Sequence, residues 1–479
     1  MLNTLEVWWI GFDGSVQDAY WYEGGGPWNQ VTLAPKGSAS IIGRITAVSR
    51  IPSSLEVWWT GNDGSLRDSN FYQGGSWNQS PLSPSHTASY QGGIAAVSRI
   101  PSSMEVWWIG GNGSVQDSYW YDSTSFNVQA FSDRLQSDLQ GKAVGYSFSV
   151  SYQDQWEDMR AGGSARTSAD SNPLLMNPFV QFSIASLSKT ITAAAALQLL
   201  EPNQSNNLLD AAVGQYLPAD FTRDNNFKAI TFRQLLQHRS GVPAKTGYDV
   251  DYNSLKSYVN GYPNVSNKSY QYSNTNYALF RLLIPNLAGI PLSGDPGTAY
   301  ADAYIQYVQQ HVFSPIVLGS ISASTDSSSG LDYHFPLQPY HPGGWDLGDL
   351  TLKIASQGWV MSTQDLAHFL RDLSYTENIL SGAISKQMRD KCMGYDACGA
   401  PAASGSTYAY WSKGGFYPGC GFGNPGEFNG SSIVFSNGLS VAVIVNSNLA
   451  YNSQADSCGY QDSDPVQAVL DAFNNAIGK

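Results

Sequence analysis

The residues best suited to chemistry stand at the start of an alanine- and leucine-rich segment, residues 182–201. Ser186 precedes Lys189 by three residues, so on the expected helix both side chains lie on one face. A serine hydroxyl becomes a good nucleophile when a neighbouring base takes its proton, and a lysine in a dry pocket has a lowered pKa that suits this task. Free N–H groups at the helix N-terminus favour an anionic transition state beside Ser186. The segment predicts a nucleophilic serine with a lysine partner, although so short a pattern also arises by chance.

Two weaker patterns follow along the chain. Tyr272 and Asn274 flank a serine, and a tyrosine beside a nucleophile can act as a general base if positive charge lowers its pKa. The asparagine amide can hold both a substrate carbonyl and the lysine. Further on, Lys413, Gly414 and Gly415 would let a strand edge lie against a substrate backbone. Each pattern alone is more often an ordinary turn.

Taken together, and in this order, the three patterns resemble the motifs of penicillin-recognising serine hydrolases. They are most similar to the branch of class C β-lactamases, DD-carboxypeptidases and family VIII esterases, in which the second motif begins with tyrosine. Flanking segments at 235–243, 272–280 and 360–370 are also similar, and the resemblance covers roughly residues 128–479. It implies an α/β (α+β) β-lactamase/transpeptidase-like domain with an antiparallel sheet and a helical subdomain.

The resemblance also implies roles for the residues of the first two motifs. Ser186 would be the acylated nucleophile, and Lys189 and Tyr272 together would remove and return its proton. Asn274 would position the substrate. The expected reaction is hydrolysis of an ester or amide, as in esterases and D-amino-acid peptidases, without a metal or an organic cofactor.

The third motif would form the opposite side of the site. Lys413, Gly414 and Gly415 would line it, and the backbone N–H groups of Ser186 and Phe416 would form the oxyanion hole. β-Lactamases of this branch usually carry threonine where this chain has Gly414. The missing hydroxyl disfavours hydrolysis of β-lactams and leaves ester or peptide hydrolysis open.

The first part of the chain is an aromatic repeat. Segments that begin at Leu5, Leu55 and Met104 agree closely, with a period of 49 to 50 residues. Each copy pairs two strand-like runs around an Asp-Gly or Asn-Gly turn, which predicts a β-hairpin. Adjacent tryptophans within each copy would face opposite sides of their strand, so one ring can pack inside the blade while the other faces a groove or a neighbouring blade. The second ring then either belongs to the core as well or stacks on a sugar.

This repeat resembles the tryptophan-rich blades of bacterial and fungal fucose-binding propeller lectins, over roughly residues 2–122. About two and a half copies cannot close a ring. The natural protein is therefore longer at its N-terminus, or chains self-associate through the repeats, or the blades lean on the following domain. A glycan is the ligand that the resemblance implies. We predict two domains, a blade-like module at 1–127 and the hydrolase at 128–479.

Composition narrows the remaining possibilities. The net charge of −13, with no basic cluster, argues against nucleic acid and anionic membrane surfaces as partners. No apolar run is long enough to span a membrane. A charged fraction of 13% and four clustered cysteines suggest a secreted protein with one or two disulfides. A zinc site is the alternative use of the cysteines, but no C-x-x-C spacing supports it.

Periodicity within the second domain predicts its elements. An amphipathic helix is expected from Phe131, and a buried strand from Ala143 that leads to a turn at Gly162-Gly163. Two strands should surround Asn437-Gly438, and a last helix should begin near Asp464. The alternative function is a carbohydrate-binding protein whose hydrolase domain is secondary or inactive; three intact motifs argue against it.

Overall fold

The structure is a computed structural model of the chain with two compact units, residues 1–126 with 477–479 and residues 127–476. The residues that it describes are 4–22, 25–49, 54–72, 75–98, 103–121, 126–153, 155–201, 208–222, 225–242, 250–261, 268–337, 341–418, 426–451, 455–456, 459–460 and 465–477.

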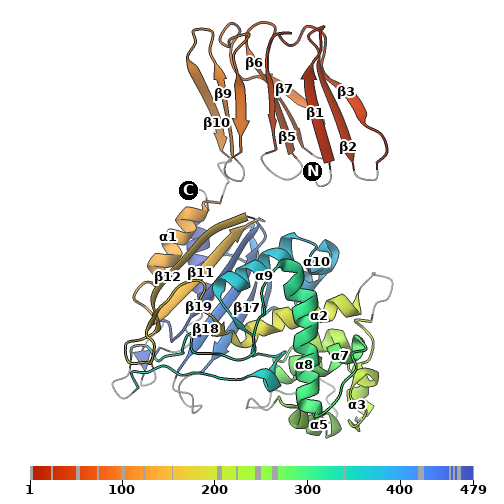
Figure 1. Cartoon of the computed structure of the whole chain (residues 1–479), viewed down its shortest axis with the longest axis vertical. Coiled ribbons are helices and arrows are strands. Elements are labelled where there is room, and N and C mark those ends of the chain that lie inside the picture. The colour runs from red at the N-terminus through yellow and green to blue at the C-terminus, as the bar shows by residue number, and fades with distance from the viewer. Residues whose placement is uncertain are drawn as a thin grey trace. The chain divides into compact units, whose positions relative to one another are not determined.

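The first unit consists of three antiparallel sheets, one for each copy of the repeat (Figure 1). Their strand orders are β1-β2-β3, β4-β5-β6-β7 and β10-β9-β8. The strands are β1 (Thr4–Ile10), β2 (Val16–Tyr22), β3 (Asn29–Ala34), β4 (Ile45–Val48), β5 (Ser54–Thr60), β6 (Leu66–Tyr72), β7 (Asn78–Pro81), β8 (Ile94–Val97), β9 (Ser103–Ile109) and β10 (Val115–Tyr121).

The predicted hairpins are confirmed in all three copies. Strands β1 and β2, β5 and β6, and β9 and β10 pair in register around their turns. The turn glycines Gly14, Gly64 and Gly113 all have φ between 72° and 81°, which other residues rarely adopt. The described sheets do not form a closed propeller.

The first and third copies each expose a position that the other two copies bury. Val57 and Val106 are 0% and 3% exposed, whereas their counterpart Val7 in the first copy is 52% exposed. Val115 in the third copy is 70% exposed, although its counterparts Val16 and Leu66 are fully buried. These faces are the ones that the predicted self-association would cover.

The second unit is built on a seven-stranded antiparallel sheet of order β13-β12-β11-β19-β18-β17-β16. Strands from the beginning and end of the domain therefore lie side by side at β11 and β19. The strands of this unit are β11 (Gly145–Tyr152), β12 (Gln155–Arg166), β13 (Leu174–Leu175), β14 (Phe182–Ser183), β15 (Val360–Met361), β16 (Ala397–Pro401), β17 (Ala409–Tyr417), β18 (Phe428–Phe435), β19 (Leu439–Val445), β20 (Ala455–Asp456) and β21 (Gly459–Tyr460).

Helices cover both faces of this sheet. In Figure 1, α1 lies on one face, and α9 with the α2 region lies on the other. The α-helices are α1 (Val128–Leu139), α2 (Ser188–Leu200), α3 (Asn225–Lys228), α4 (Phe232–Leu236), α5 (Tyr252–Asn260), α6 (Asn274–Ala278), α7 (Phe280–Leu287), α8 (Pro296–Val308), α9 (Thr363–Tyr375), α10 (Gly382–Asp390) and α11 (Pro465–Ala476). Shorter helical turns are η1 (Ala185–Leu187), η2 (Val213–Tyr216), η3 (Gln309–Phe313), η4 (Ser314–Ile316) and η5 (Thr351–Lys353).

Helix α2 lies at the centre of this unit. Nearly all of its residues are buried, as expected of a helix surrounded by protein, and from Ala193 onward its buried side chains are apolar. The small side chains of residues 193–196 allow helices α7 and α8 to pack close to it. The first turn of α2, which carries Lys189, is thereby fixed by the domain core.

The element predictions were correct except at one pair of glycines. The expected turn at Gly162-Gly163 is wrong, because both residues lie within β12 and pair with Tyr146 and Gly145. A Cβ on Gly163 would approach the Val144 carbonyl oxygen to 2.2 Å, and one on Gly162 would meet the Tyr146 ring at 2.7 Å. Glycine is required here by the close approach of neighbouring groups and, at Gly163, also by a φ of 78°, although both residues lie within a strand.

Within the described residues, no helix combines the length and apolar character needed to cross a membrane.

Candidate active site

Ser186 lies in a constrained turn at the start of α2. The preceding residue, Ala185, has φ 48°, in the left-handed region that residues with a side chain seldom occupy. The turn is fixed by two backbone hydrogen bonds, from Ile184 to the Trp359 carbonyl at 2.9 Å and from Leu187 to the Ile184 carbonyl at 3.1 Å. Strain of this kind persists where surrounding structure imposes it, and it often marks a functional residue.

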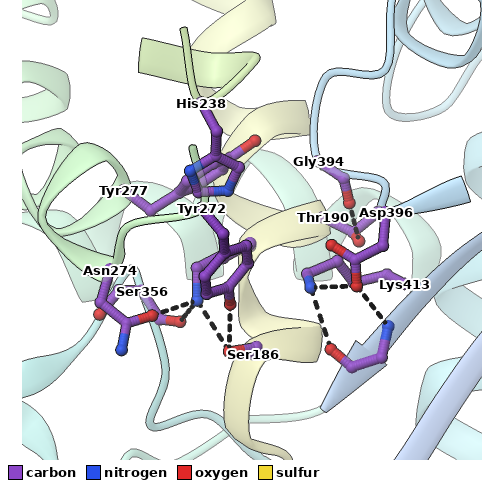
Figure 2. Close-up of polar contacts among 12 residues, drawn as sticks. Ser186, Thr190, His238, Tyr272, Asn274, Tyr277, Ser356, Gly394, Asp396 and Lys413 are labelled. Carbon is purple, nitrogen blue, oxygen red and sulfur yellow. Dashed lines mark hydrogen bonds and ion pairs between the residues drawn. The ribbon is translucent and has the colours of Figure 1, made fainter. Parts of the chain in front are cut away.

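Lys189 is fully buried beneath Ser186, one turn along the chain. Its Nζ donates to Ser186 Oγ at 2.8 Å, to the side-chain oxygen of Asn274 at 2.8 Å and to the Ser356 carbonyl at 2.7 Å (Figure 2). These three acceptors use the full donor capacity of an ammonium group. The lysine is therefore aimed at Ser186 with little rotational freedom.

Tyr272 approaches Ser186 from the other side. Its hydroxyl donates to Ser186 Oγ at 2.7 Å, so the serine oxygen lies between a phenol and an amine. Nζ of Lys189 and Nζ of Lys413 lie 4.9 Å and 5.1 Å from the centre of the Tyr272 ring. The tyrosine is consequently held between two cationic side chains.

Burial and charge set the pKa values of the two candidate bases. Burial lowers the pKa of Lys189 to about 8, with Tyr272 acting in the opposite direction. Burial would raise the pKa of the Tyr272 phenol, but the Lys189 and Lys413 charges outweigh it and hold that pKa below its ordinary value. Each group can therefore lose its proton at a lower pH than it would in water.

His238 supports Tyr272 from behind. Its ring centre lies 4.6 Å from that of Tyr272, and its carbonyl accepts a hydrogen bond from Gln271 N–H at 2.8 Å. Its Nδ1 accepts from Ser273 N–H at 3.2 Å, which makes Nδ1 the unprotonated nitrogen. Burial, with the nearby Lys189 and Lys413 charges, lowers the pKa of His238 to about 2. His238 thus holds the backbone on both sides of Tyr272, through its carbonyl at Gln271 and its neutral imidazole at Ser273.

The third motif forms the wall opposite Tyr272. Lys413 Nζ lies 2.7 Å from Asp396 Oδ2, and Gly414 N–H donates to the same oxygen at 3.0 Å (Figure 2). Burial would lower the pKa of Lys413, but Tyr272 and Asp396 outweigh it and raise that pKa, so this lysine is an ammonium. Lys413 is 2% exposed, which leaves Asp396 as the more accessible partner.

Strand β17 lies directly against the Ser186 turn. A Cβ on Gly415 would meet the Ile184 carbonyl oxygen at 2.6 Å and the Leu187 side chain at 2.9 Å. Glycine is therefore required for this contact. Pairing with β16 covers Ala409–Ser412, and in the described part of the chain no strand covers this edge of β17 beyond Ser412. Phe416 follows on that edge and is 51% exposed.

The structure thus brings the predicted residues together around Ser186. Lys189, Tyr272 and Asn274 form one hydrogen-bonded cluster with it, and strand β17, with Lys413 to Phe416, forms the adjacent wall. The catalytic roles remain predictions. Sequence reasoning missed Ser356, His238 and Asp396. Of these, His238 lay in a flanking segment already seen to resemble the hydrolases, whereas no local pattern indicated Asp396.

A disulfide joins Cys392 to Cys398 and closes the loop that carries Asp396. The other two cysteines, Cys420 and Cys458, lie outside the described residues. Among the residues that are described, no cluster of three histidine, cysteine or carboxylate side chains could hold a metal ion.

The comparisons with known proteins agree with this fold. The beta-lactamase family profile matches residues 127–464, more than half of the chain. The chain therefore belongs to the beta-lactamase family of serine hydrolases. A relative from Bacillus subtilis (strain 168), named "Putative penicillin-binding protein PbpX", is 24% identical over 296 residues. The match covers 58% of this chain and 64% of that protein, so this chain spans less than two thirds of its relative's length.

Solved structures share the fold at low identity. The D-amino acid amidase from Ochrobactrum anthropi SV3 has a TM-score of 0.54 and 19% identity, over 72% of this chain and 99% of the amidase. The class C β-lactamase from Rhodobacter sphaeroides has a TM-score of 0.53 and 18% identity, again over 72% and 99% of the two chains. At these identities, the two matches show a shared fold only.

A second candidate site lies within the first unit, separate from the Ser186 cluster. A cavity of about 220 Å³ is lined by Trp59, Asp68 and polar groups of neighbouring strands and of the 37–38 loop. Trp59 is 2% exposed, and its Nε1 has no hydrogen-bond acceptor among the described residues. Asp68 Oδ1 is buried and likewise has no donor, and burial raises the pKa of Asp68 to about 6. The register of β5 and β6 pairs Trp59 with Arg67 and Trp58 with Asp68, so the Trp59 and Asp68 side chains lie on opposite faces of this sheet, and only the indole N–H can serve the Trp59 side of the cavity.

Proposed function

We propose that this protein is a serine acyl hydrolase that cleaves an ester or amide through a covalent intermediate on Ser186. The observation that carries the proposal is the placement of Ser186 Oγ between Lys189 Nζ at 2.8 Å and the Tyr272 hydroxyl at 2.7 Å. The pKa values of both neighbours are lowered, which favours their deprotonated forms. An activated nucleophile with an adjacent base is the requirement for acyl transfer.

The first half of the reaction acylates the serine. When Tyr272 or Lys189 loses its proton, its contact with Ser186 reverses and it accepts the hydroxyl proton. Ser186 Oγ then bonds to the substrate carbonyl carbon, and the carbonyl oxygen becomes an oxyanion. The N–H groups of Ser186 and Phe416 are the proposed donors to it. Collapse breaks the bond to the leaving group, which takes the stored proton.

The second half returns the free enzyme. A water molecule gives its proton to the same base and bonds to the acyl carbon, and the serine leaves with that proton. Asn274, which accepts from Lys189 through its side-chain oxygen, has amide N–H groups that can contact the acyl part of the substrate. The proposal is supported by the two proton-transfer groups, which both lie within hydrogen-bond distance of Ser186 Oγ.

Covalent labelling tests this proposal. We expect a fluorophosphonate to add one adduct mass to the intact protein and none to the Ser186→Ala variant. Exposure to activated esters, D-amino-acid amides and β-lactams should then identify the acyl class from the mass gained. Amides are favoured by the similarity in fold to a D-amino acid amidase, and β-lactams are disfavoured by Gly414. Wild-type protein that takes no label would leave the carbohydrate-binding function, with an inactive hydrolase domain, as the better account.

We propose carbohydrate binding as the function of the first unit. The supporting observation is the cavity beside Trp59, whose buried Nε1 has no acceptor among the described residues. A sugar hydroxyl can accept from the indole N–H, and the aromatic ring offers a stacking surface. The cavity is smaller than the roughly 300–1,000 Å³ of pockets for drug-sized ligands, which suits a single sugar ring. A secreted protein with a disulfide is the setting in which such a module would act.

A further inference from the structure

The Lys413 wall has a feature that bears on the substrate class. A buried lysine beside a backbone N–H is a favourable site for a carboxylate, because both groups donate and one is charged. In this protein that position already holds a carboxylate of the chain itself. One oxygen of Asp396, Oδ2, accepts from Lys413 Nζ at 2.7 Å and from Gly414 N–H at 3.0 Å.

The loop that carries Asp396 is anchored at several points. Asp396 N–H donates to the Ser412 carbonyl at 2.7 Å, and the Gly394 carbonyl accepts from Thr190 Oγ1 at 2.8 Å (Figure 2). Gly394 has φ 86°, and a Cβ there would approach the Ala193 side chain to 2.9 Å, so the loop lies directly on α2. The Cys392–Cys398 disulfide closes the same loop. Displacing Asp396 from Lys413 would therefore require the loop to move.

The exposure of the pair decides which charge a substrate meets. Lys413 has a side chain that is 2% exposed, whereas that of Asp396 is 37% exposed. Both hydrogen bonds use Oδ2, which leaves Oδ1 free of the Lys413 and Gly414 contacts. A cavity of about 330 Å³ is lined in part by Asp396 and Asp390 and in part by Arg239 and Lys391. An approaching group therefore meets the Asp396 carboxylate before it meets the Lys413 ammonium.

We propose that Asp396 makes the Lys413 wall a subsite for a cationic group, so that the enzyme takes esters or amides bearing an ammonium and rejects those bearing a carboxylate there. The inference rests on the proposed acyl hydrolysis at Ser186 and specifies its substrate class. A substrate carboxylate would have to displace Asp396 from two donors or lie beside a like charge. An ammonium would instead gain a charge-assisted hydrogen bond to Oδ1.

Matched activated esters test the proposal. We would measure kcat/KM for 4-nitrophenyl esters of ω-amino, unsubstituted and ω-carboxy acids, each over a range of chain lengths. The wild-type enzyme should prefer ammonium over neutral and neutral over carboxylate esters at the chain length that reaches Asp396. In Asp396→Asn the ratio of ammonium to carboxylate rates should fall by about tenfold or more, since one charge of direct contact has been removed. Added salt should also lower the wild-type ratio of ammonium to carboxylate rates, because it screens the charge of Asp396.

Controls separate this inference from the proposed function and from misfolding. Asp210→Asn removes a carboxylate from a different ion pair, with Arg233, and should leave the ratio unchanged. The rate of phosphonate labelling and the melting temperature show whether Asp396→Asn keeps its nucleophile and fold. Asp396→Glu, which retains the charge, should keep the wild-type order of substrates.

Three results would overturn the inference while leaving acyl hydrolysis intact. They are a wild-type preference for carboxylate esters, a wild-type enzyme that does not distinguish the three ester series, and an unchanged ratio in an Asp396→Asn variant that still labels. Failure to cleave or label with any ester would instead reject the proposed function itself.

Discussion

The Ser186 cluster and the cavity beside Trp59 in the first unit differ in whether their buried polar atoms have hydrogen-bond partners. Around Ser186, Lys189 has three acceptors and Tyr272 donates directly to the serine. Beside the cavity, Trp59 Nε1 is buried with no hydrogen-bond acceptor among the described residues. A buried polar atom without a partner costs about 1–3 kcal/mol, which a ligand that supplies the missing bond would return.

This difference separates two kinds of site. Catalysis requires groups that are already oriented before the substrate arrives, so a fully bonded cluster is expected of it. Recognition can leave its donors and acceptors unpaired until a ligand completes them. If the comparison holds, substitutions in the cluster should affect rate, and substitutions in the cavity should affect affinity.

The largest effect on rate should come from the two candidate bases. Lys189→Ala and Tyr272→Phe should each lower kcat/KM by roughly 10³-fold, and the double variant should lose little more, because groups that act as a unit are not additive. A steady-state comparison of the three variants on one activated ester measures this. Lys256→Ala, which removes a surface lysine paired with Asp220, is the matched control and should leave kcat/KM unchanged. Losses that multiply in the double variant would show that the two residues act independently.

The pH dependence of the rate should report the same pair. Burial lowers the pKa of Lys189 to about 8, and a base works only after it has lost its proton. Activity should therefore rise with pH through an apparent value near 8 and be lost as pH falls below it. Because Lys189 and Tyr272 interact, that value belongs to the pair and not to one residue. A profile of kcat/KM that stays flat from pH 6 to 9 would contradict a role for either group as base.

A smaller effect is expected at His238, which contacts Tyr272 and its flanking backbone but not Ser186. His238→Phe keeps a ring against Tyr272 and removes the acceptor for Ser273 N–H. We expect kcat to fall by about tenfold with little change in KM, since a small misplacement of a catalytic group is costly. The apparent pKa of the rate profile should also shift, because Tyr272 would move relative to the two lysines. Unchanged kinetics together with a lower melting temperature would show that His238 serves stability alone.

Much of the fold could be predicted because it is encoded locally. The Asp-Gly and Asn-Gly turns specify hairpins wherever they stand between alternating strands, and all three hairpins are present. The glycine pair at Gly162-Gly163 gave the wrong prediction for the same reason. A local pattern cannot distinguish a glycine needed for a turn from one needed because Val144 and Tyr146 pack against it.

The candidate site could be predicted in its motifs but not in its supporting contacts. Ser186 and Lys189 share a helical turn, and their spacing alone places them together. Asp396 reaches Lys413 because a disulfide-closed loop rests on α2, which is a consequence of tertiary packing. Such a contact leaves no pattern in the sequence around Asp396. The charge of the Lys413 wall was therefore hidden until the fold was known.

The prediction with the smallest effect on turnover concerns the cavity beside Trp59, where Trp59→Phe keeps an aromatic ring and removes the N–H. This change should weaken binding to a responsive sugar by about tenfold, the effect of one lost hydrogen bond to a buried group, and leave ester hydrolysis unchanged. Titration calorimetry with a panel of monosaccharides that includes fucose measures the affinity. Trp28→Phe is the matched control, since it makes the same change at a tryptophan of the first copy that is 49% exposed. Sugar binding that survives Trp59→Phe, or a wild-type protein that binds no sugar in the panel, would contradict the proposal that the first unit holds a recognition site.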